Sequence, residues 1–189
     1  MKITFLGGGN MANALIGGML KQGFAAADIT VVDPGSAARD KLERTYAVNC
    51  LETGEMLDNI GDLLVLAVKP QQMKEAVAPL VGKLGNAVVV SIAAGLDLAT
   101  LARFLGGHRK IVRCMPNTPA LIGAGITGLC PLPEVSAAER EAADCVLSAV
   151  GSTVWIDNEG RMDGVTALSG SGPAYVFLFI EALQQAAAD

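Results

Sequence analysis

The sequence predicts an α/β fold with a doubly wound, mainly parallel β-sheet, and three observations carry this prediction. A β-favouring run at residues 2–6 meets three consecutive glycines, residues 7–9, and a helix-forming run begins at Met11. Residues 63–68 are apolar at every position, which is typical of a parallel strand covered on both faces. Strand-like and helix-like runs alternate along the first 156 residues, which indicates parallel strands joined by right-handed crossovers.

The first half of the chain is expected to form strands and helices in turn. Gly23 can end the first helix in a left-handed conformation. The turn signature at residues 33–35 ends the second strand, and Ser36 is a candidate N-cap for the next helix. The expected strands are residues 2–6, 29–32, 47–49, 63–68 and 87–92, and the expected helices are residues 11–22, 37–46 and 71–80.

The second half continues the alternation and then loosens. Ser136 and Glu139 form a capping box, which predicts a helix start. The charged, turn-prone residues 157–161 mark the expected border of the first domain, and Pro173 suits the first turn of a final apolar helix. The expected strands are residues 110–114, 125–129 and 153–156, and the expected helices are residues 98–105, 136–149 and 173–189.

The glycine run has the spacing of a dinucleotide-binding motif. Gly7, Gly9 and Ala12 fit the pattern G-x-G-x-x-G/A between a strand and a helix. In this motif the first glycine permits the tight turn, and the second lets the backbone approach a pyrophosphate closely. The N–H groups and the dipole of the helix then face the phosphates. The motif therefore predicts that this loop binds a dinucleotide cofactor.

The end of the second strand carries conflicting signals about that cofactor. Asp33 stands about 20 residues beyond the glycine motif, where an acidic side chain binds the ribose 2′-hydroxyl of NAD. Ser36 and Arg39 follow and could instead receive a 2′-phosphate, the arginine through a bidentate fork. A turn aspartate without a cofactor role is the plainer alternative. The sequence leaves NAD and NADP open at this point.

Five loops are expected to converge on one crevice, because ligands of doubly wound sheets bind at the carboxyl ends of the strands. The segments at those ends are residues 7–12, 33–36, 67–70, 93–95 and 115–119. Lys69 lies at a strand end beside this crevice. It could be a catalytic base, but we favour a contact with the cofactor.

Composition argues against several other classes of function. With 51% hydrophobic and 17% charged residues, the chain is expected to fold around a core. A net charge of −5, without a Lys/Arg cluster, argues against nucleic-acid binding. The four cysteines lie far apart and there is one histidine, so we expect no disulfide framework, no Ser–His–Asp set and no metal site. No run approaches about 18 apolar residues, so we expect a soluble, cytoplasmic protein.

Five sequence blocks identify a family. They are FLGGGNMA at residues 5–12, AVKP at 67–70, VSIAAG at 90–95, RCMPNTP at 113–119 and LSGSGPAY at 168–175. Together, in this order and spacing, they resemble pyrroline-5-carboxylate reductase over essentially the whole chain. The resemblance implies a Rossmann-like NAD(P)-binding domain at residues 1–158, followed at residues 159–189 by the beginning of an all-helical domain.

The resemblance also implies an activity and its residues. The activity is reduction of 1-pyrroline-5-carboxylate to L-proline by hydride from NAD(P)H, the last step of proline biosynthesis, with NADP(H) favoured and NAD(H) as the alternative. An iminium substrate is already electrophilic, which fits a site without an obvious histidine acid. The implied cofactor-binding residues are Gly7, Gly8, Gly9, Asn10, Met11, Ala12, Asp33, Ser36, Arg39, Ala67, Val68, Lys69, Pro70, Ala94 and Asn117.

The substrate side of the site is less defined. Ser169, Ser171 and Glu159 are the candidates near the substrate, and the catalytic proton donor is not identified. Residues 169–172, at an expected helix start, suit the substrate carboxylate or its surroundings. Family members continue into a helical domain that forms dimers, so we expect an incomplete chain that associates through this domain, with no nucleic-acid or membrane partner.

Two other functions are left open. A dehydrogenase of the hydroxyacid or 6-phosphogluconate type would share the first domain. Those enzymes tend to place a catalytic lysine on a later helical segment, and no lysine follows Lys110 here. A non-catalytic module would bind NADPH without turning over a substrate.

Overall fold

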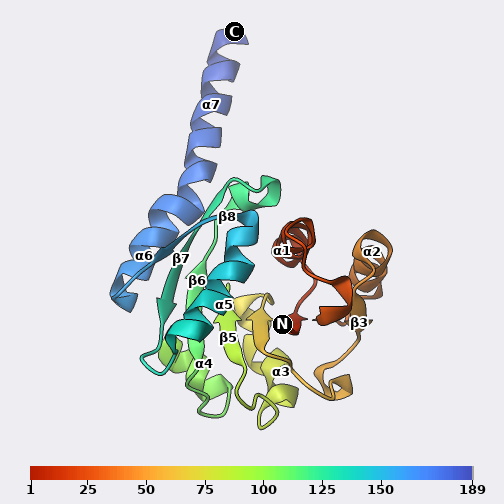
Figure 1. The fold of residues 1–189 in the computed structure, drawn as a ribbon. Helices are drawn as coiled ribbons and strands as arrows, with labels where there is room; N and C mark the ends of the chain where they lie inside the picture. Colours follow the sequence, from red (N-terminus) through yellow and green to blue (C-terminus); the bar gives the residue numbers. More distant parts are fainter. Residues whose placement is uncertain (189) are drawn as a thin grey trace.

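An eight-stranded β-sheet organises the computed structural model, which describes residues 1–188 (Figure 1). The strand order is β3-β2-β1-β4-β5-β6-β7-β8, so the chain starts inside the sheet and builds first to one edge and then to the other. Neighbouring strands are parallel except β6 and β7, which are antiparallel. The predicted doubly wound, mainly parallel sheet is confirmed.

The strands are short and alternate with the helices along most of the chain. Their bounds are β1 Ile3–Leu6, β2 Ile29–Val32, β3 Asn49–Leu51, β4 Leu63–Leu66, β5 Val88–Ser91, β6 Ile111–Met115, β7 Gly125–Pro131 and β8 Gly151–Trp155. The α-helices are α1 Asn10–Lys21, α2 Ser36–Tyr46, α3 Met73–Val77, α4 Leu98–Phe104, α5 Ala137–Leu147, α6 Met162–Val165 and α7 Gly172–Ala188. Shorter helical turns include η3 Pro70–Gln72, η5 Thr118–Ile122, η7 Glu159–Arg161 and the π-helical η8 Thr166–Ser171.

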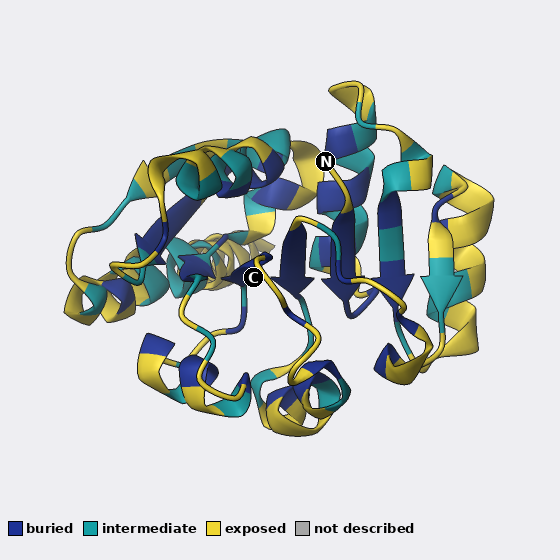
Figure 2. Cartoon of the chain, turned by 60° about the horizontal axis from the view of Figure 1, so that its bottom comes forward, coloured by how far each residue is buried: buried dark blue, intermediate teal, exposed yellow. Residues whose placement is uncertain are grey.

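Helices cover both faces of the sheet and create two apolar layers. On one face α1, α2 and α5 pack around side chains such as Phe5 and Val65, and on the other face α3 and α4 pack around Leu64 and Leu66. Successive residues of β4 alternate between the two layers, which is why this strand has no polar position. Figure 2 shows the buried central strands between the two helical layers. The carboxyl ends of these strands therefore meet at one edge, with the loops after β1, β4, β5 and β6.

Two expected elements differ in detail. The helix expected at residues 71–80 is a 3-10 turn, the short helix α3 and a second 3-10 turn, Ala78–Leu80. Pro79 explains the break, because a proline donates no backbone hydrogen bond and disturbs the preceding turn. The third strand lies two residues later than expected, at Asn49–Leu51, after Ala47 takes a left-handed conformation with φ of 54°.

The C-terminal segment is a continuous helical rod that projects from the sheet (Figure 1). The backbone stays helical from Glu159 to Ala188 and passes through the π-helical turn η8 between α6 and α7. A new helix beginning in the middle of this segment was therefore the wrong expectation. Pro173 lacks an N–H to bond the preceding turn, and the widened π-helical turn just before it accommodates that loss.

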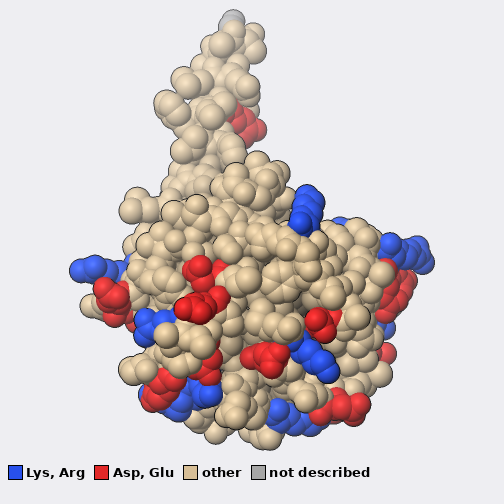
Figure 3. All heavy atoms as spheres, in the orientation of Figure 1, with Lys and Arg blue, Asp and Glu red and all other residues tan. Residues whose placement is uncertain are grey.

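A second expectation was wrong for the same rod. The sequence predicts no apolar run of membrane-spanning length, but the rod is such a run. By length and composition alone, Glu159–Ala188 is long and apolar enough to cross a membrane, and 0% of its most apolar window is buried in this chain. Figure 3 shows the projecting rod as almost free of charged side chains. Large side chains of α7 are exposed, from 45% for Ile180 to 67% for Tyr175. An apolar surface of this extent is also typical of a protein–protein contact.

Candidate cofactor and substrate site

The loop after β1 lies at the topological switch point of the sheet, where the strand order reverses, because β1 pairs with β2 on one side and with β4 on the other. Gly7 has φ of +103°, which favours glycine, and a Cβ there would lie 2.7 Å from the carbonyl oxygen of Ala67. Its N–H donates to the carbonyl of Val32 at 2.8 Å. The fold itself therefore requires glycine at the first position of the motif.

Gly9 differs from its neighbours because nothing in the described chain crowds it. A Cβ at Gly8 would lie 2.9 Å from Cδ1 of Leu42, whereas a Cβ at Gly9 would meet no atom within 4 Å. Gly9 is the N-cap of α1, and no side chain among residues 1–188 caps this helix. Open space beside uncapped N–H groups fits a phosphate bound against the backbone, so this loop suits the pyrophosphate of a dinucleotide.

Asp33 braces the glycine loop from the end of β2. Its Oδ2 accepts a hydrogen bond from the N–H of Gly8 at 2.7 Å, and its Oδ1 accepts one from the N–H of Gly35 at 2.8 Å. Gly35 is the N-cap of α2, which therefore begins at Ser36, one residue earlier than expected. Both carboxylate oxygens thus have a structural partner, and a contact of Asp33 with ribose stays a prediction.

Arg39 lies over the same turn. Its Nη1 donates to the carbonyl of Asp33 at 2.7 Å, and its Nη2 lies 3.7 Å from Oε2 of Glu52. These contacts hold a positive charge at the end of β2, where the adenosine side of a dinucleotide is expected. Burial, and then the carboxylate of Glu43, raises the pKa of the nearby Cys50 thiol to about 11, so this thiol stays neutral at physiological pH.

The loop after β4 borders the glycine loop, and the loop after β5 lies one strand further along the sheet. Cγ1 of Val68 lies 3.1 Å from the position that a Cβ of Gly7 would take. Lys69 is exposed at the N-cap of η3, and no hydrogen bond or ion pair to its ammonium group is found within the described chain. Ala94 is exposed after β5. These loops leave a cation and two small or apolar side chains free to contact a cofactor.

A cavity of about 310 Å³ joins the glycine loop to the C-terminal helical segment. Its lining comes from the start of α1, the residue after β5, the end of β6 with the following loop and η5, and the π-helical turn η8. The lining residues are Asn10, Met11, Ile92, Met115, Pro116, Asn117, Thr118, Leu121 and Gly170. Three predicted cofactor residues, Asn10, Met11 and Asn117, therefore lie around one cavity. Gly170 belongs to the segment 169–172 that the sequence places near the substrate, whereas Ile92 and Leu121 were not predicted, since an apolar loop residue carries no chemical signal of its own.

A larger hollow, of about 850 Å³, lies on the outer side of α1 and reaches α2 and η5. It contains the hydroxyl of Tyr46, which donates to Oδ1 of Asn13 at 2.9 Å. We place the candidate site at the smaller cavity, because that cavity lies at the carboxyl ends of the strands, where doubly wound sheets bind their ligands.

Asn117 connects the β6 loop to the helical segment. Its Nδ2 donates to Oγ of Ser169 at 3.1 Å, and its Oδ1 accepts from the N–H of Ile126 at 2.9 Å. Ser169 is thereby held near the cavity, and Ser171 is half-buried in the same π-helical turn. The expected helix start at residues 169–172 is wrong, because these residues lie inside a continuous helical rod.

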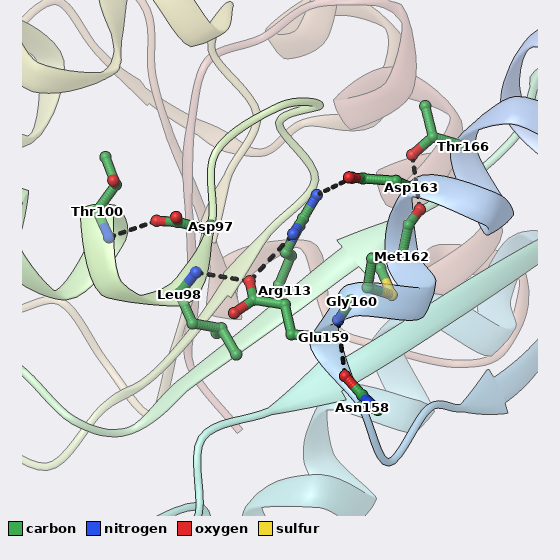
Figure 4. Close-up of polar contacts among 10 residues, drawn as sticks. All are labelled: Asp97, Leu98, Thr100, Arg113, Asn158, Glu159, Gly160, Met162, Asp163 and Thr166. Carbon is green, nitrogen blue, oxygen red and sulfur yellow. Dashed lines mark hydrogen bonds and ion pairs between the residues drawn. The ribbon is translucent and has the colours of Figure 1, made fainter.

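Glu159 lies outside the cavity lining. Its Oε1 accepts a hydrogen bond from the N–H of Leu98 at 2.7 Å and lies 3.1 Å from Nη1 of Arg113 (Figure 4). The carboxylate therefore binds the N-terminus of α4 and a buried cation. This arrangement gives no support to the predicted closeness of Glu159 to the substrate.

The fold and the glycine loop define a class of dinucleotide-binding proteins, and comparison with known proteins narrows the class. Residues 2–95 match the family model described as NADP oxidoreductase coenzyme F420-dependent, and residues 159–189 match the model described as pyrroline-5-carboxylate reductase dimerisation. The pyrroline-5-carboxylate reductase of Pseudomonas aeruginosa is 47% identical over 98% of this chain and 68% of its own length. The Escherichia coli enzyme of the same name is 38% identical over 98% of this chain and 70% of its own length.

Solved structures of proteins with the same or nearly the same name are also similar to this chain. A pyrroline-5-carboxylate reductase from Coxiella burnetii has a TM-score of 0.91 at 37% identity and covers 99% of this chain and 70% of its own. The Plasmodium falciparum pyrroline carboxylate reductase with NADP bound has a TM-score of 0.86 at 31% identity, over 100% of this chain and 69% of its own. The chain belongs to the pyrroline-5-carboxylate reductase family. Prephenate dehydrogenase from Aquifex aeolicus, at 17% identity and a TM-score of 0.75, shares the fold alone.

Proposed function

We propose that this protein reduces 1-pyrroline-5-carboxylate to L-proline with hydride from NAD(P)H, in the final step of proline biosynthesis. The observation that carries the proposal is 47% identity over 98% of the chain to a pyrroline-5-carboxylate reductase. The glycine loop supports it, because Gly9 and the start of α1 leave backbone N–H groups beside open space. It is an NAD(P)H-dependent oxidoreductase that acts on a carbon–nitrogen double bond.

The cofactor would be held along the carboxyl ends of β1, β2 and β4. Residues 7–12 would bind the pyrophosphate, and Asp33, Ser36 and Arg39 would face the adenosine ribose. Residues 67–70, with Ala94 and Asn117, would contact the nicotinamide half. When bound, NAD(P)H supplies the hydride, and the protein supplies orientation. We favour NADP(H), with NAD(H) also accepted, since the Arg39 guanidinium is already held at the end of β2.

The substrate would lie in the 310 Å³ cavity between the β6–η5 loop and η8. A protonated cyclic imine is electrophilic without help from an acid, so the residues here need only place its carbon against the cofactor. Asn117, which lines this cavity, donates from its amide nitrogen to the hydroxyl of Ser169 at 3.1 Å, and Ser169 directly precedes the lining residue Gly170. Ser169 and Ser171 are our candidates for contacts with the substrate.

The remaining assignments concern the whole chain. We place the domain border between residues 158 and 159, with a homo-oligomer formed through the helical domain that follows. We place the protein in the cytoplasm, with no nucleic-acid or membrane partner. Its net charge of −5 and the dimerisation match at residues 159–189 support this view over a membrane-spanning role for the rod.

Steady-state reduction of pyrroline-5-carboxylate by the complete gene product tests the proposal, with NADH and NADPH compared side by side. We expect cofactor oxidation that depends on the imine and yields proline in equal amount. NADPH binding without turnover would instead indicate a non-catalytic module. Turnover of a 2-hydroxyacid but not of the imine would indicate another dehydrogenase.

A further inference from the structure

A buried cation joins the sheet to the C-terminal helical segment. Arg113 lies on β6, and its side chain is 8% exposed. Its Nη1 lies 3.1 Å from Oε1 of Glu159, and its Nη2 lies 3.4 Å from Oδ1 of Asp163 (Figure 4). Both carboxylates belong to residues 159–189, the segment that matches the dimerisation model. The two ion pairs therefore cross the border between the sheet and the helical rod.

Glu159 also binds the connection between β5 and α4. Its Oε1 accepts from the N–H of Leu98, the first residue of α4, at 2.7 Å, while the N-cap Asp97 accepts from the N–H of Thr100 at 2.7 Å. The carboxylates of Glu159 and Asp97 thus both accept hydrogen bonds from the N-terminus of α4, and the guanidinium of Arg113 offsets the repulsion between them. One carboxylate, that of Glu159, ties together β6, α4 and the start of the rod.

The same side of β6 contacts the rod twice more. Alternate residues along an extended chain face the same side, which groups Arg113 with Met115 and, just beyond the strand, Asn117. Cε of Met115 lies 2.7 Å from the position that a Cβ of Gly170 would take, and Asn117 donates to Ser169 at 3.1 Å. Arg113 therefore holds the beginning of the rod, and the next two residues on its side hold the turn that borders the cavity.

We propose that Arg113 is a positioning residue for the reduction: through Glu159 it fixes the helical rod on β6 and so sets where Ser169 and Gly170 lie beside the bound substrate. This inference rests on the proposed function. Apolar side chains of similar volume can often replace a buried ion pair as a whole at no cost in stability, so stability alone does not explain the pair. The planar guanidinium reaches Glu159 and Asp163 through two separate nitrogens, and this rigid geometry fixes the direction and length of the contact, as placement requires. Asp163 contributes less, because its side chain is 89% exposed and water screens the pair.

Arg113→Met tests the inference in the complete gene product, because it removes the guanidinium and keeps an unbranched side chain. We expect kcat to fall by about ten- to a hundredfold, as a displacement of about 1 Å at a reacting centre can cost that much. The Kd for NADPH should stay unchanged, since the glycine loop is not involved. Arg113→Lys should restore part of kcat, because it keeps the charge and loses the fork.

Glu159→Gln provides a second variant that keeps an acceptor for Leu98, so the inference stays testable should Arg113→Met fail to fold. We expect it to lower kcat, again without changing the Kd for NADPH. The double variant, which combines Arg113→Met with Glu159→Gln, should have a kcat no lower than that of Arg113→Met alone. Both changes act on the same contact, the ion pair between Arg113 and Glu159.

Two controls separate positioning from stability. Ile111→Val lies on the same strand, is buried and loses one methyl group that takes no part in the ion pairs, so it should lower the melting temperature and leave kcat unchanged. Asp163→Asn removes the exposed partner and should change kcat by less than about twofold. An unchanged kcat in Arg113→Met, or equal losses in Arg113→Met and Ile111→Val, would overturn the inference. A wild-type protein that does not reduce the imine would overturn the proposed function itself.

Discussion

The three glycines after β1 are glycine for different reasons. Gly7 needs a positive φ and lies against the Ala67 carbonyl, and a Cβ on Gly8 would press on Leu42. Only at Gly9 does the described chain itself not require glycine, since a Cβ there would meet nothing within 4 Å. A ligand that approaches the backbone explains this third glycine, and the spacing of the motif predicts such a ligand at the same position.

Gly9→Val should therefore abolish cofactor binding and spare the fold. The added isopropyl group would occupy the space where we place the pyrophosphate, so we expect the Kd for NADPH to rise about a hundredfold or more, equivalent to about 2.8 kcal/mol. Energy transfer from Trp155 to the nicotinamide, or calorimetry, would measure the change. Gly164→Ala is the matched control, because a Cβ there also meets no atom within 4 Å and the residue lies in α6. An unchanged titration in Gly9→Val would remove this loop from the cofactor site.

Cofactor choice is expected to depend on the charges around Arg39. Arg39→Ala removes the cation at the end of β2 and should lower kcat/KM for NADPH relative to NADH by about tenfold, the size of one charge-assisted contact to a phosphate. Glu52→Gln makes the opposite change, since Glu52 Oε2 lies 3.7 Å from the guanidinium, and should raise that ratio. A wild-type preference for NADH that neither change alters would contradict this prediction.

Other residue roles could not be predicted from the sequence, because their partners are distant in the chain. Asp33 holds the turn through Gly35, as one of the two interpretations of the sequence predicts, but its second contact, with Gly8, spans 25 residues. Glu159 was placed near the substrate by resemblance, whereas its contacts with Leu98 and Arg113 span 61 and 46 residues. Local patterns identify the type of side chain, and only the folded sheet decides which partner it meets.

At the scale of elements, prediction succeeded where periodicity and capping agreed. The fully apolar run at residues 63–68 contains the buried strand β4, which ends two residues earlier at Leu66, and the capping box of Ser136 and Glu139 starts α5. Prediction failed around two prolines. The third helix is reduced to α3, which ends at the 3-10 turn that contains Pro79, and the π-helical turn before Pro173 keeps the rod continuous where we expected a start. Whether a proline ends or only widens a helix depends on packing that propensity does not describe.

Ser136→Ala tests the capping box at the start of α5. Ser136 Oγ accepts from the N–H of Glu139 at 3.3 Å, and Glu139 Oε2 accepts from the N–H of Ser136 at 2.8 Å. Loss of the cap should cost about 1 kcal/mol and lower the melting temperature by about 2–4 °C. Ser148→Ala, at the other end of the helix, is the control and should have a smaller effect.

The same variant should show a defined pH dependence. Partial burial raises the pKa of Glu139, but hydrogen bonds from Lys110 and Ser136 outweigh it and hold that pKa below its usual value. A lowered carboxyl pKa stabilises the fold at neutral pH, and this stabilisation is lost as the pH falls through the lowered pKa. The difference in unfolding free energy between wild type and Ser136→Ala should therefore shrink in acid. A constant difference from neutral to acidic pH would show that the Glu139 side chain takes no part.

At the scale of the whole molecule, a well-covered sheet carries an uncovered apolar rod. Both faces of the sheet are packed by helices, while α7 has large side chains such as Phe177 and Phe179 that are 66% and 64% exposed. Figure 3 shows charged side chains spread over the body and nearly absent from the rod. Residues 159–189 match a dimerisation model, and an exposed apolar surface of this extent is typical of a protein–protein contact.

Phe177→Glu tests whether α7 is the surface through which the protein associates. We expect light scattering to show an oligomer for the wild type and a smaller species for the variant, because a charge within a buried apolar contact is costly to desolvate. NADPH binding should persist, since we assign the cofactor to the loops of the sheet and not to α7. Val81→Glu changes a side chain that is 45% exposed on the body and should leave the assembly intact. A wild-type protein that is strictly monomeric and fully active would show that α7 has been misinterpreted and that the substrate site needs no partner.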